Sequence, residues 1–334
     1  MNKLNQHIIL FISLLAILSS CEKEIDFSGQ YDDSGIAVYA IAVPGEPFSM
    51  RLSRSFTVND NPTVVYSSYY RELDTLYRTE IVINNAQVEV TVNGSEKYAM
   101  TYNPVSPYAY NCDYVPKEGD NISVKVSAPG YHDISASTKI EKIQMAQITK
   151  TEVVYKDNGD DGSVIVGNPL DRFGVDSVMS ITLKIDDPAG EHNFYRLRVC
   201  GVADQELPFG TFTYKQYNLS DVFTSDDIIF SDNMLTKPFG DWQAGFSNVF
   251  DDHLFDGKEY TFTVESRKRN GDNPHVILEL QTISQDLYYF LKSYQVFRIS
   301  TDDVYMTPIG LYSNIKDGWG ILGSLSYDRH IIYY

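Results

Sequence analysis

The sequence is poor in the residues that build metal and thiol chemistry, with three cysteines and six histidines among 334 residues. The histidines are scattered and no Cys/His spacing resembles a zinc site, so no metal site is predicted from them. Besides Cys21, only Cys112 and Cys200 remain, and these fit either one disulfide or two separate buried thiols. No G-x-S-x-G motif and no phosphate-cradling glycine loop occur, so no catalytic residue and no cofactor is predicted.

Basic residues are also scarce, because 27 lysines and arginines face 45 aspartates and glutamates, giving a formal net charge of -18. So acidic a chain is a poor partner for nucleic acid, and its charge opposes direct docking on an anionic bilayer surface. The length suggests two domains, and a hydrophobic fraction of 43% is sufficient for ordinary cores.

The first twenty residues have the pattern of a secretory signal peptide. Lys3 is followed by an almost wholly apolar run over residues 8–18, and small residues then lead to Cys21. The ending Leu18-Ser19-Ser20-Cys21 resembles a bacterial lipoprotein box, which implies cleavage before Cys21 and acylation of that residue. The alternatives are a signal peptide cleaved elsewhere or a transmembrane helix, but the run is shorter than the ~20 residues that cross a bilayer.

The rest of the chain divides into three parts. Residues 21–35 form a polar, lipidated tether, whose acidic start resembles the export tag of surface-exposed Bacteroidota lipoproteins. Residues 36–145 are predicted to form an immunoglobulin-like β-sandwich, and residues 146–334 a second β-rich domain with one amphipathic helix. The boundary is expected near residues 141–152.

Alternation of apolar and polar residues predicts the strands. The clearest case is Val88, Val90 and Val92, which are followed by the hairpin signal Asn93-Gly94. Strands are expected around residues 36–43, 48–52, 86–92, 98–102, 122–126, 134–140, 181–185, 195–199, 258–265 and 276–280.

One stretch changes to helical spacing. Its apolar positions are Leu287, Phe290, Leu291, Tyr294 and Phe297. Ser284 suits the N-cap position and Asp286 suits the positively polarised first turn, so a helix is predicted to begin here and to pack its aromatic face on the second sheet.

Two acidic segments are candidates for chemistry. The loop at 156–163 fails the calcium-loop pattern because Gly159 stands at the third position, which leaves either a loose calcium site through Asp157, Asp160 and Asp161 or a solvated turn. The segment Asp251-Asp252-His253 with Asp256 has the residue types for acid–base work. However, Asp256-Gly257 is also typical of a hairpin turn, and adjacent strand residues point to opposite faces.

Tyrosine dominates the aromatic content and suits recognition surfaces as well as sheets. Tyr66, Tyr69 and Tyr70 lie in a polar excursion over residues 57–79, and together with Trp242 and Trp319 they are the candidate ligand- or partner-binding residues. The segments around Thr75 and Ser177 resemble the Asp-Ser/Thr-apolar sequon of Bacteroidota O-glycosylation.

The whole pattern resembles the Bacteroidota outer-membrane lipoproteins of domain-of-unknown-function family 4249. The resemblance covers the mature chain and rests on the box at Cys21, the strand at 38–43, the strand at 86–92, and the motifs Leu52-Ser53-Arg54-Ser55, Asp186-Asp187-Pro188, Asn193-Phe194-Tyr195, Phe250-Asp251, Phe255-Asp256-Gly257-Lys258, Ser313-Asn314-Ile315 and Gly318-Trp319-Gly320-Ile321 with Gly323. The glycines at 318, 320 and 323 predict tight turns or a close backbone approach.

The resemblance implies an outer-membrane lipoprotein that faces either the cell surface or the periplasm and is commonly associated with TonB-dependent transporters, and it implies no catalytic residues. Of the two faces, the cell exterior is the expected one. The expected function is therefore a non-enzymatic accessory or binding subunit of such a β-barrel. One alternative is a structural subunit of a larger outer-membrane assembly or secretion machine. The other is a glycan- or peptide-active hydrolase whose carboxylates converge from Asp251, Asp252 or Asp256.

Overall fold

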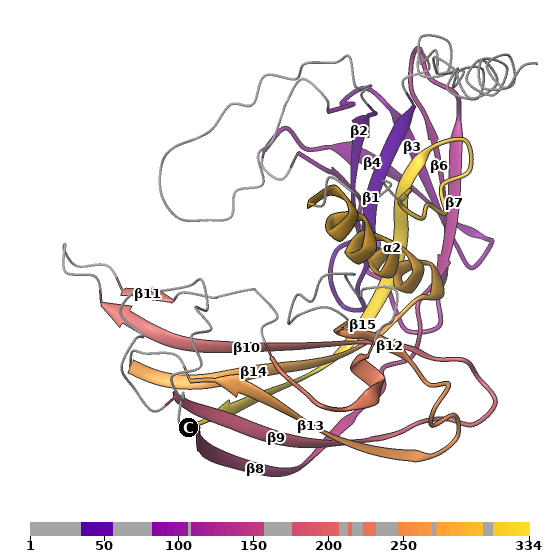
Figure 1. The fold of residues 1–334 in the computed structure, drawn as a ribbon. Helices are drawn as coiled ribbons and strands as arrows, with labels where there is room; N and C mark the ends of the chain where they lie inside the picture. The colour runs from indigo at the N-terminus through magenta and orange to yellow at the C-terminus, as the bar shows by residue number, and fades with distance from the viewer. Residues whose placement is uncertain are drawn as a thin grey trace, which may run out of the picture. The chain divides into compact units, whose positions relative to one another are not determined.

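The computed structural model in Figure 1 describes residues 35–55, 82–105, 108–156, 176–206, 213–215, 223–231, 246–268, 272–302 and 310–334. Several predictions fall outside these residues: the lipidation site Cys21, the tyrosines at 66, 69 and 70, Thr75, Trp242, and the acidic loop with Asp157, Asp160 and Asp161.

The chain is mainly β, as predicted. Its elements are β1 (Ile36–Ala42), β2 (Ser49–Arg54), β3 (Gln87–Val92), β4 (Glu96–Tyr102), β5 (Tyr110–Asn111), β6 (Asn121–Ser127), β7 (Ile134–Lys139), β8 (Ala146–Lys156), β9 (Asp176–Asp186), β10 (Phe194–Glu206), β11 (Thr213–Lys215), the 3-10 helix η2 (Ile228–Phe230), β12 (Val249–Asp251), β13 (Glu259–Arg267), β14 (Asp272–Ile283), α2 (Gln285–Asp302) and β15 (Trp319–Tyr333). The strands expected from alternation are present, whereas the alternation did not indicate β5, β8, β11, β12 and β15.

The predicted hairpin between β3 and β4 is confirmed in detail. Asn93 and Gly94 have φ values of 51° and 73°, and the amide of Ser95 donates to the carbonyl of Val92 at 3.1 Å. Positive φ at both central residues is the geometry of a type I′ turn, whose twist matches that of the flanking strands.

The strands form two sheets. One has twelve strands in the order β11-β10-β14-β15-β1-β2-β5-β4-β3-β6-β7, with β12 pairing with β10, and the other has the order β13-β9-β8. A hydrophobic core lies between β9 and β13 on one side and β10 and β14 on the other, with Leu183, Leu197, Phe262 and Leu280 among its buried members. This packing is that of a β-sandwich.

Strand β15 connects the two halves of the twelve-stranded sheet, since it pairs antiparallel with β14 and parallel with β1. The predicted close approach at the glycines is confirmed, because a Cβ on Gly320 would lie 2.0 Å from the carbonyl oxygen of Val38. Gly320 and Gly323 nevertheless lie inside a strand and not in tight turns. The core of the N-terminal half also contains Ile315 and Leu322 from this end of the chain.

The predicted helix is confirmed as α2. The hydroxyl of Ser284 accepts from the amide of Leu287 at 3.4 Å, and Asp286 lies in the first turn. Leu287 is buried with Ile283 and Ile321 of the sheet, and Phe290 and Leu291 pack against the same cluster. Within the described ranges, no helix is long and apolar enough to cross a membrane.

Candidate functional site

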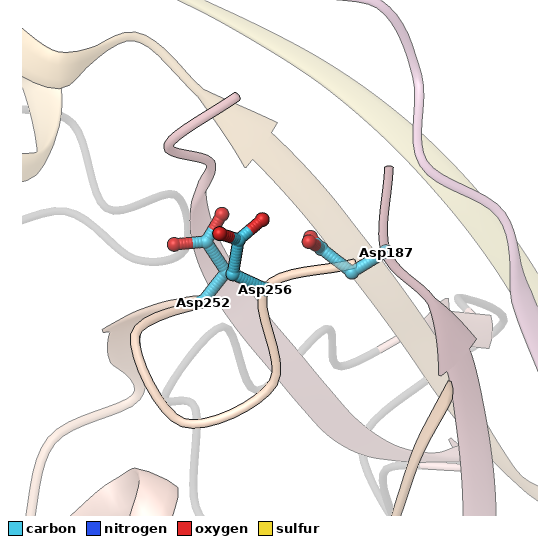
Figure 2. Close-up of side chains that lie close together, drawn as sticks. All are labelled: Asp187, Asp252 and Asp256. Carbon is cyan, nitrogen blue, oxygen red and sulfur yellow. The ribbon is translucent and has the colours of Figure 1, made fainter. Parts of the chain in front are cut away.

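Two turns of the C-terminal half bring three carboxylates together (Figure 2). Asp187 directly follows β9, and Asp252 and Asp256 lie in the turn that follows β12. Their carboxylate oxygens lie within 4.8 Å of one another. Asp256 is exposed, but Asp187 and Asp252 are only 4% and 1% exposed, so two charges are held almost out of contact with water.

Asp187 lies at the centre of a hydrogen-bonded arrangement. Its carboxylate accepts from the hydroxyl of Tyr195 at 2.5 Å and from the amide of Gly257 at 3.1 Å. Burial raises the pKa of Asp187, and the neighbouring charges of Asp252 and Asp256 raise it further, which outweighs the lowering effect of the two donors. Burial and the bond to this carboxylate likewise raise the pKa of Tyr195, so its hydroxyl stays protonated and continues to donate.

The other two carboxylates connect the same pair of turns. Asp252 accepts from the amide of Asn193 at 2.6 Å, and Asp256 accepts from the amide of Gly190 at 3.1 Å. The turns also touch directly, because a Cβ on Gly257 would lie 2.7 Å from the Cβ of Ala189. The three carboxylates therefore hold the turn at residues 187–193 against the turn at residues 252–257.

Asp251 belongs to a different set of contacts. It bonds the imidazole and the amide of His253 and accepts from the Tyr288 hydroxyl at 3.4 Å. Burial alone would raise the pKa of Asp251, but the hydrogen bonds from His253 and the charges of His253 and His192 bring it below its ordinary value. The imidazole of His192 lies 3.6 Å from Asp251 and 3.4 Å from Asp252, so it lies between the contacts of Asp251 and the three-carboxylate cluster.

The model of the family described as "Domain of unknown function (DUF4249)" matches residues 22–331. The chain belongs to the DUF4249 family. The family resemblance inferred from the motifs is thereby confirmed, and a comparison with curated proteins gave no match.

In this DUF4249 member, the repulsion among the three carboxylates can be relieved either by a bound cation or by a proton. Three carboxylates at this spacing supply the oxygen ligands that hard cations such as calcium accept. Alternatively, a proton retained on Asp187 lowers the repulsion within the cluster, in keeping with its raised pKa. In both cases a bulky substrate could touch only the exposed Asp256, because the other two carboxylates are buried.

The remaining predicted residues are dispersed. Ser177 is half-buried within β9 and pairs with Tyr155 of β8, while Trp319 is exposed at the start of β15. Cys112 and Cys200 are half-buried and are not joined in a disulfide, and burial raises the pKa of the Cys112 thiol. Of the acidic candidates, Asp252 and Asp256 converge. Their partner Asp187 was not predicted, because Asp186-Asp187-Pro188 is typical of an ordinary turn.

Proposed function

We propose that this chain is a lipid-anchored, non-enzymatic accessory subunit of a TonB-dependent transporter in the outer membrane, facing the cell exterior. The observation that carries the proposal is Leu18-Ser19-Ser20-Cys21 at the end of an apolar leader. Membership of DUF4249, whose match begins directly after Cys21, supports a domain that follows an acylated cysteine. Two or more acyl chains on that residue would give stable anchoring, which a single chain does not.

An anchor changes what docking requires. A protein confined to the same membrane as its partner meets it at a high effective concentration, so a weak contact suffices for a lasting complex. The large exposed side chains of the described surface, among them Tyr155 and Tyr294, suit such a contact.

The hydrolase alternative has one observation in its favour, namely the convergence of Asp252 and Asp256 with Asp187. Hydrolytic carboxylates must reach the scissile bond, and in this cluster Asp187 and Asp252 are buried and occupied by backbone and hydroxyl donors. The cluster is therefore better suited to holding two turns together than to hydrolysis, which supports the binding role over the hydrolytic one.

The test is affinity purification of the tagged, full-length chain from native outer membranes, followed by mass spectrometry. The expected result is a stoichiometric TonB-dependent barrel, lost in the matched variant Cys21→Ser, which cannot be acylated. Recovery of assembly or secretion components would favour a structural subunit of a larger machine. Recovery of the acylated chain alone would contradict both of these roles.

A further inference from the structure

Two large aromatic side chains lie next to each other on an open face of the sheet. Trp319 is 58% exposed and Tyr39 is 53% exposed. In the parallel pairing of β1 with β15, Ala37 lies opposite Trp319 and Tyr39 lies opposite Ile321. Residues two apart on a strand share a face, so Tyr39 and Trp319 point to the same side and lie diagonally across the two strands.

The same face is covered further along the strands. Ile41 and Ile321, which continue the rows of Tyr39 and Trp319, pack beneath Leu287, Phe290 and Leu291 of α2. Along β1 and β15, this face of the sheet is therefore apolar and covered by α2 at one end, and aromatic and exposed at the other.

The exposed aromatic end lies where the chain leads back to the lipoprotein box. A Cβ on Gly35 would lie only 2.8 Å from Nε1 of Trp319, so the indole packs against the backbone of this residue. Gly35 is held in place by Ser55, whose hydroxyl accepts from the Gly35 amide and whose amide donates to the Gly35 carbonyl, both at 2.8 Å. Only residues 22–34 separate Gly35 from Cys21, a chain that spans at most about 50 Å when fully extended.

The chemistry of this face fits a lipid headgroup region. Tryptophan and tyrosine combine a large apolar ring with one polar group, and both are enriched at membrane–water interfaces. Arg51 lies opposite Tyr39 in the β1–β2 pairing and so adds a cation to the same face. Because the net charge of -18 opposes attraction to an anionic surface, the aromatic rings must supply the contact and the acyl anchor must supply the proximity.

We propose that Tyr39 and Trp319 form a second, non-covalent contact with the headgroup region of the membrane that holds the acyl chains. This inference rests on the anchor of the proposed function and adds an orientation to it. The anchor sets how far the domain can move from the membrane, and the aromatic contact sets which face is turned toward the lipid.

The chain offers a direct spectroscopic test, because Trp242 and Trp319 are its only tryptophans. The full-length, acylated Trp242→Phe variant carries Trp319 as the sole indole, and it is reconstituted into phosphatidylcholine vesicles with and without brominated acyl chains. The expected result is a shift of tryptophan emission to shorter wavelength on reconstitution, together with quenching by the brominated lipid.

A matched pair of substitutions controls for non-specific effects. Tyr39→Ser in the Trp242→Phe background should reduce both the shift and the quenching. Tyr333→Ser should leave both unchanged, because Tyr333 is a comparably exposed tyrosine (69%) at the other end of β15, about 45 Å from Trp319 along the strand. Circular dichroism and thermal melting of each variant establish that it is folded.

The outcomes separate the two proposals. If the protein floats with the vesicles but the emission of Trp319 is neither shifted nor quenched, the proposed aromatic contact is wrong and the proposed acyl anchor is supported. If mass spectrometry finds Cys21 unmodified and the protein does not float, the anchor is wrong and the contact falls with it. Quenching that Tyr39→Ser and Tyr333→Ser reduce equally would also overturn the assignment of the contact to this face.

Discussion

Two regions of this protein place their side chains in opposite ways. The turns after β9 and β12 hold Asp187 and Asp252 in the interior, where water does not compensate their charge, whereas β1 and β15 present Tyr39 and Trp319 to solvent. Each buried carboxylate accepts hydrogen bonds from neighbouring turns, so its cost is offset inside the protein. Tyr39 and Trp319, by contrast, each leave more than half of their surface in contact with solvent. The contrast indicates that the carboxylates serve the fold, whereas the exposed rings contribute little to it and are available for the proposed membrane contact.

The strongest test of this contrast removes a buried carboxylate. Asp252→Ala removes a buried side chain and leaves the half-buried amide of Asn193 without its acceptor, and we expect the free energy of unfolding to fall by about 2–3 kcal/mol. Asp256→Ala is the control, because Asp256 is exposed and its donor Gly190 can turn to water; here we expect a fall of less than about 1 kcal/mol. Urea unfolding measures both, and equal effects would show that burial is not what makes the cluster structural.

A smaller effect is expected from a single hydroxyl. Tyr195→Phe deprives the buried Asp187 of its closest donor and should lower the free energy of unfolding by about 1–2 kcal/mol. Tyr39→Phe makes the same chemical change on the exposed face, where water replaces the protein partner, and should have almost no effect. A difference between the two variants in denaturant midpoint, at equal slope, would support the contrast, and equal midpoints would contradict it.

The raised pKa of Asp187 should make the stability of the protein depend on pH. Since its pKa is raised in the folded protein, the folded state binds the proton more tightly than the unfolded state, and stability decreases as pH rises through the window between the unfolded pKa of about 3.9 and the higher folded value. Asp187→Asn cannot release this proton, so its unfolding free energy should lack that decrease.

Asp251 acts with the opposite sign and is the internal comparison. Its pKa is lowered in the folded protein, so it adds stability above its unfolded pKa that is lost as pH falls. Thermal melting from acid to neutral pH therefore separates the two residues. An Asp187→Asn curve parallel to that of the unmodified protein would show that the raised pKa is absent.

The smallest change in stability is expected on the aromatic face. Tyr39→Ser should alter the free energy of unfolding by less than about 0.5 kcal/mol, because the ring is largely exposed and its loss leaves no buried cavity. The measurement is again urea unfolding, with Phe48→Ser, directly before β2, as a buried contrast. A large loss for Tyr39→Ser would assign the ring to the fold and remove the reason to seek a partner for it.

Local rules were sufficient for part of this architecture. The hairpin at Asn93-Gly94 and the helix after Ser284 are specified by residues within a few positions of one another, and both are present. Strand β15 escaped prediction because Gly318, Gly320 and Gly323 look like turn signals until the backbone of β1 lies against them. The immunoglobulin-like topology of the N-terminal half stays a prediction.

The carboxylate cluster shows the same limit. Asp252 and Asp256 attracted attention because they are close to each other in the sequence and beside a histidine. Asp187 belongs with them only because the turn at Gly190 and the turn at Gly257 pack together, and no local pattern records such a contact. Aspartates and glycines recurring in two separate turns were the available signal, but turns of that composition are common.

The pairing of β15 with β1 also constrains the order of events when the protein is made. Strand β1 obtains one of its two neighbours, and its core obtains Ile315 and Leu322, only from a segment that is synthesised long after β1. The N-terminal sheet therefore cannot be completed until β15 has left the ribosome. A chain that ends before residue 315 would lose the native state of its first half as well as its last.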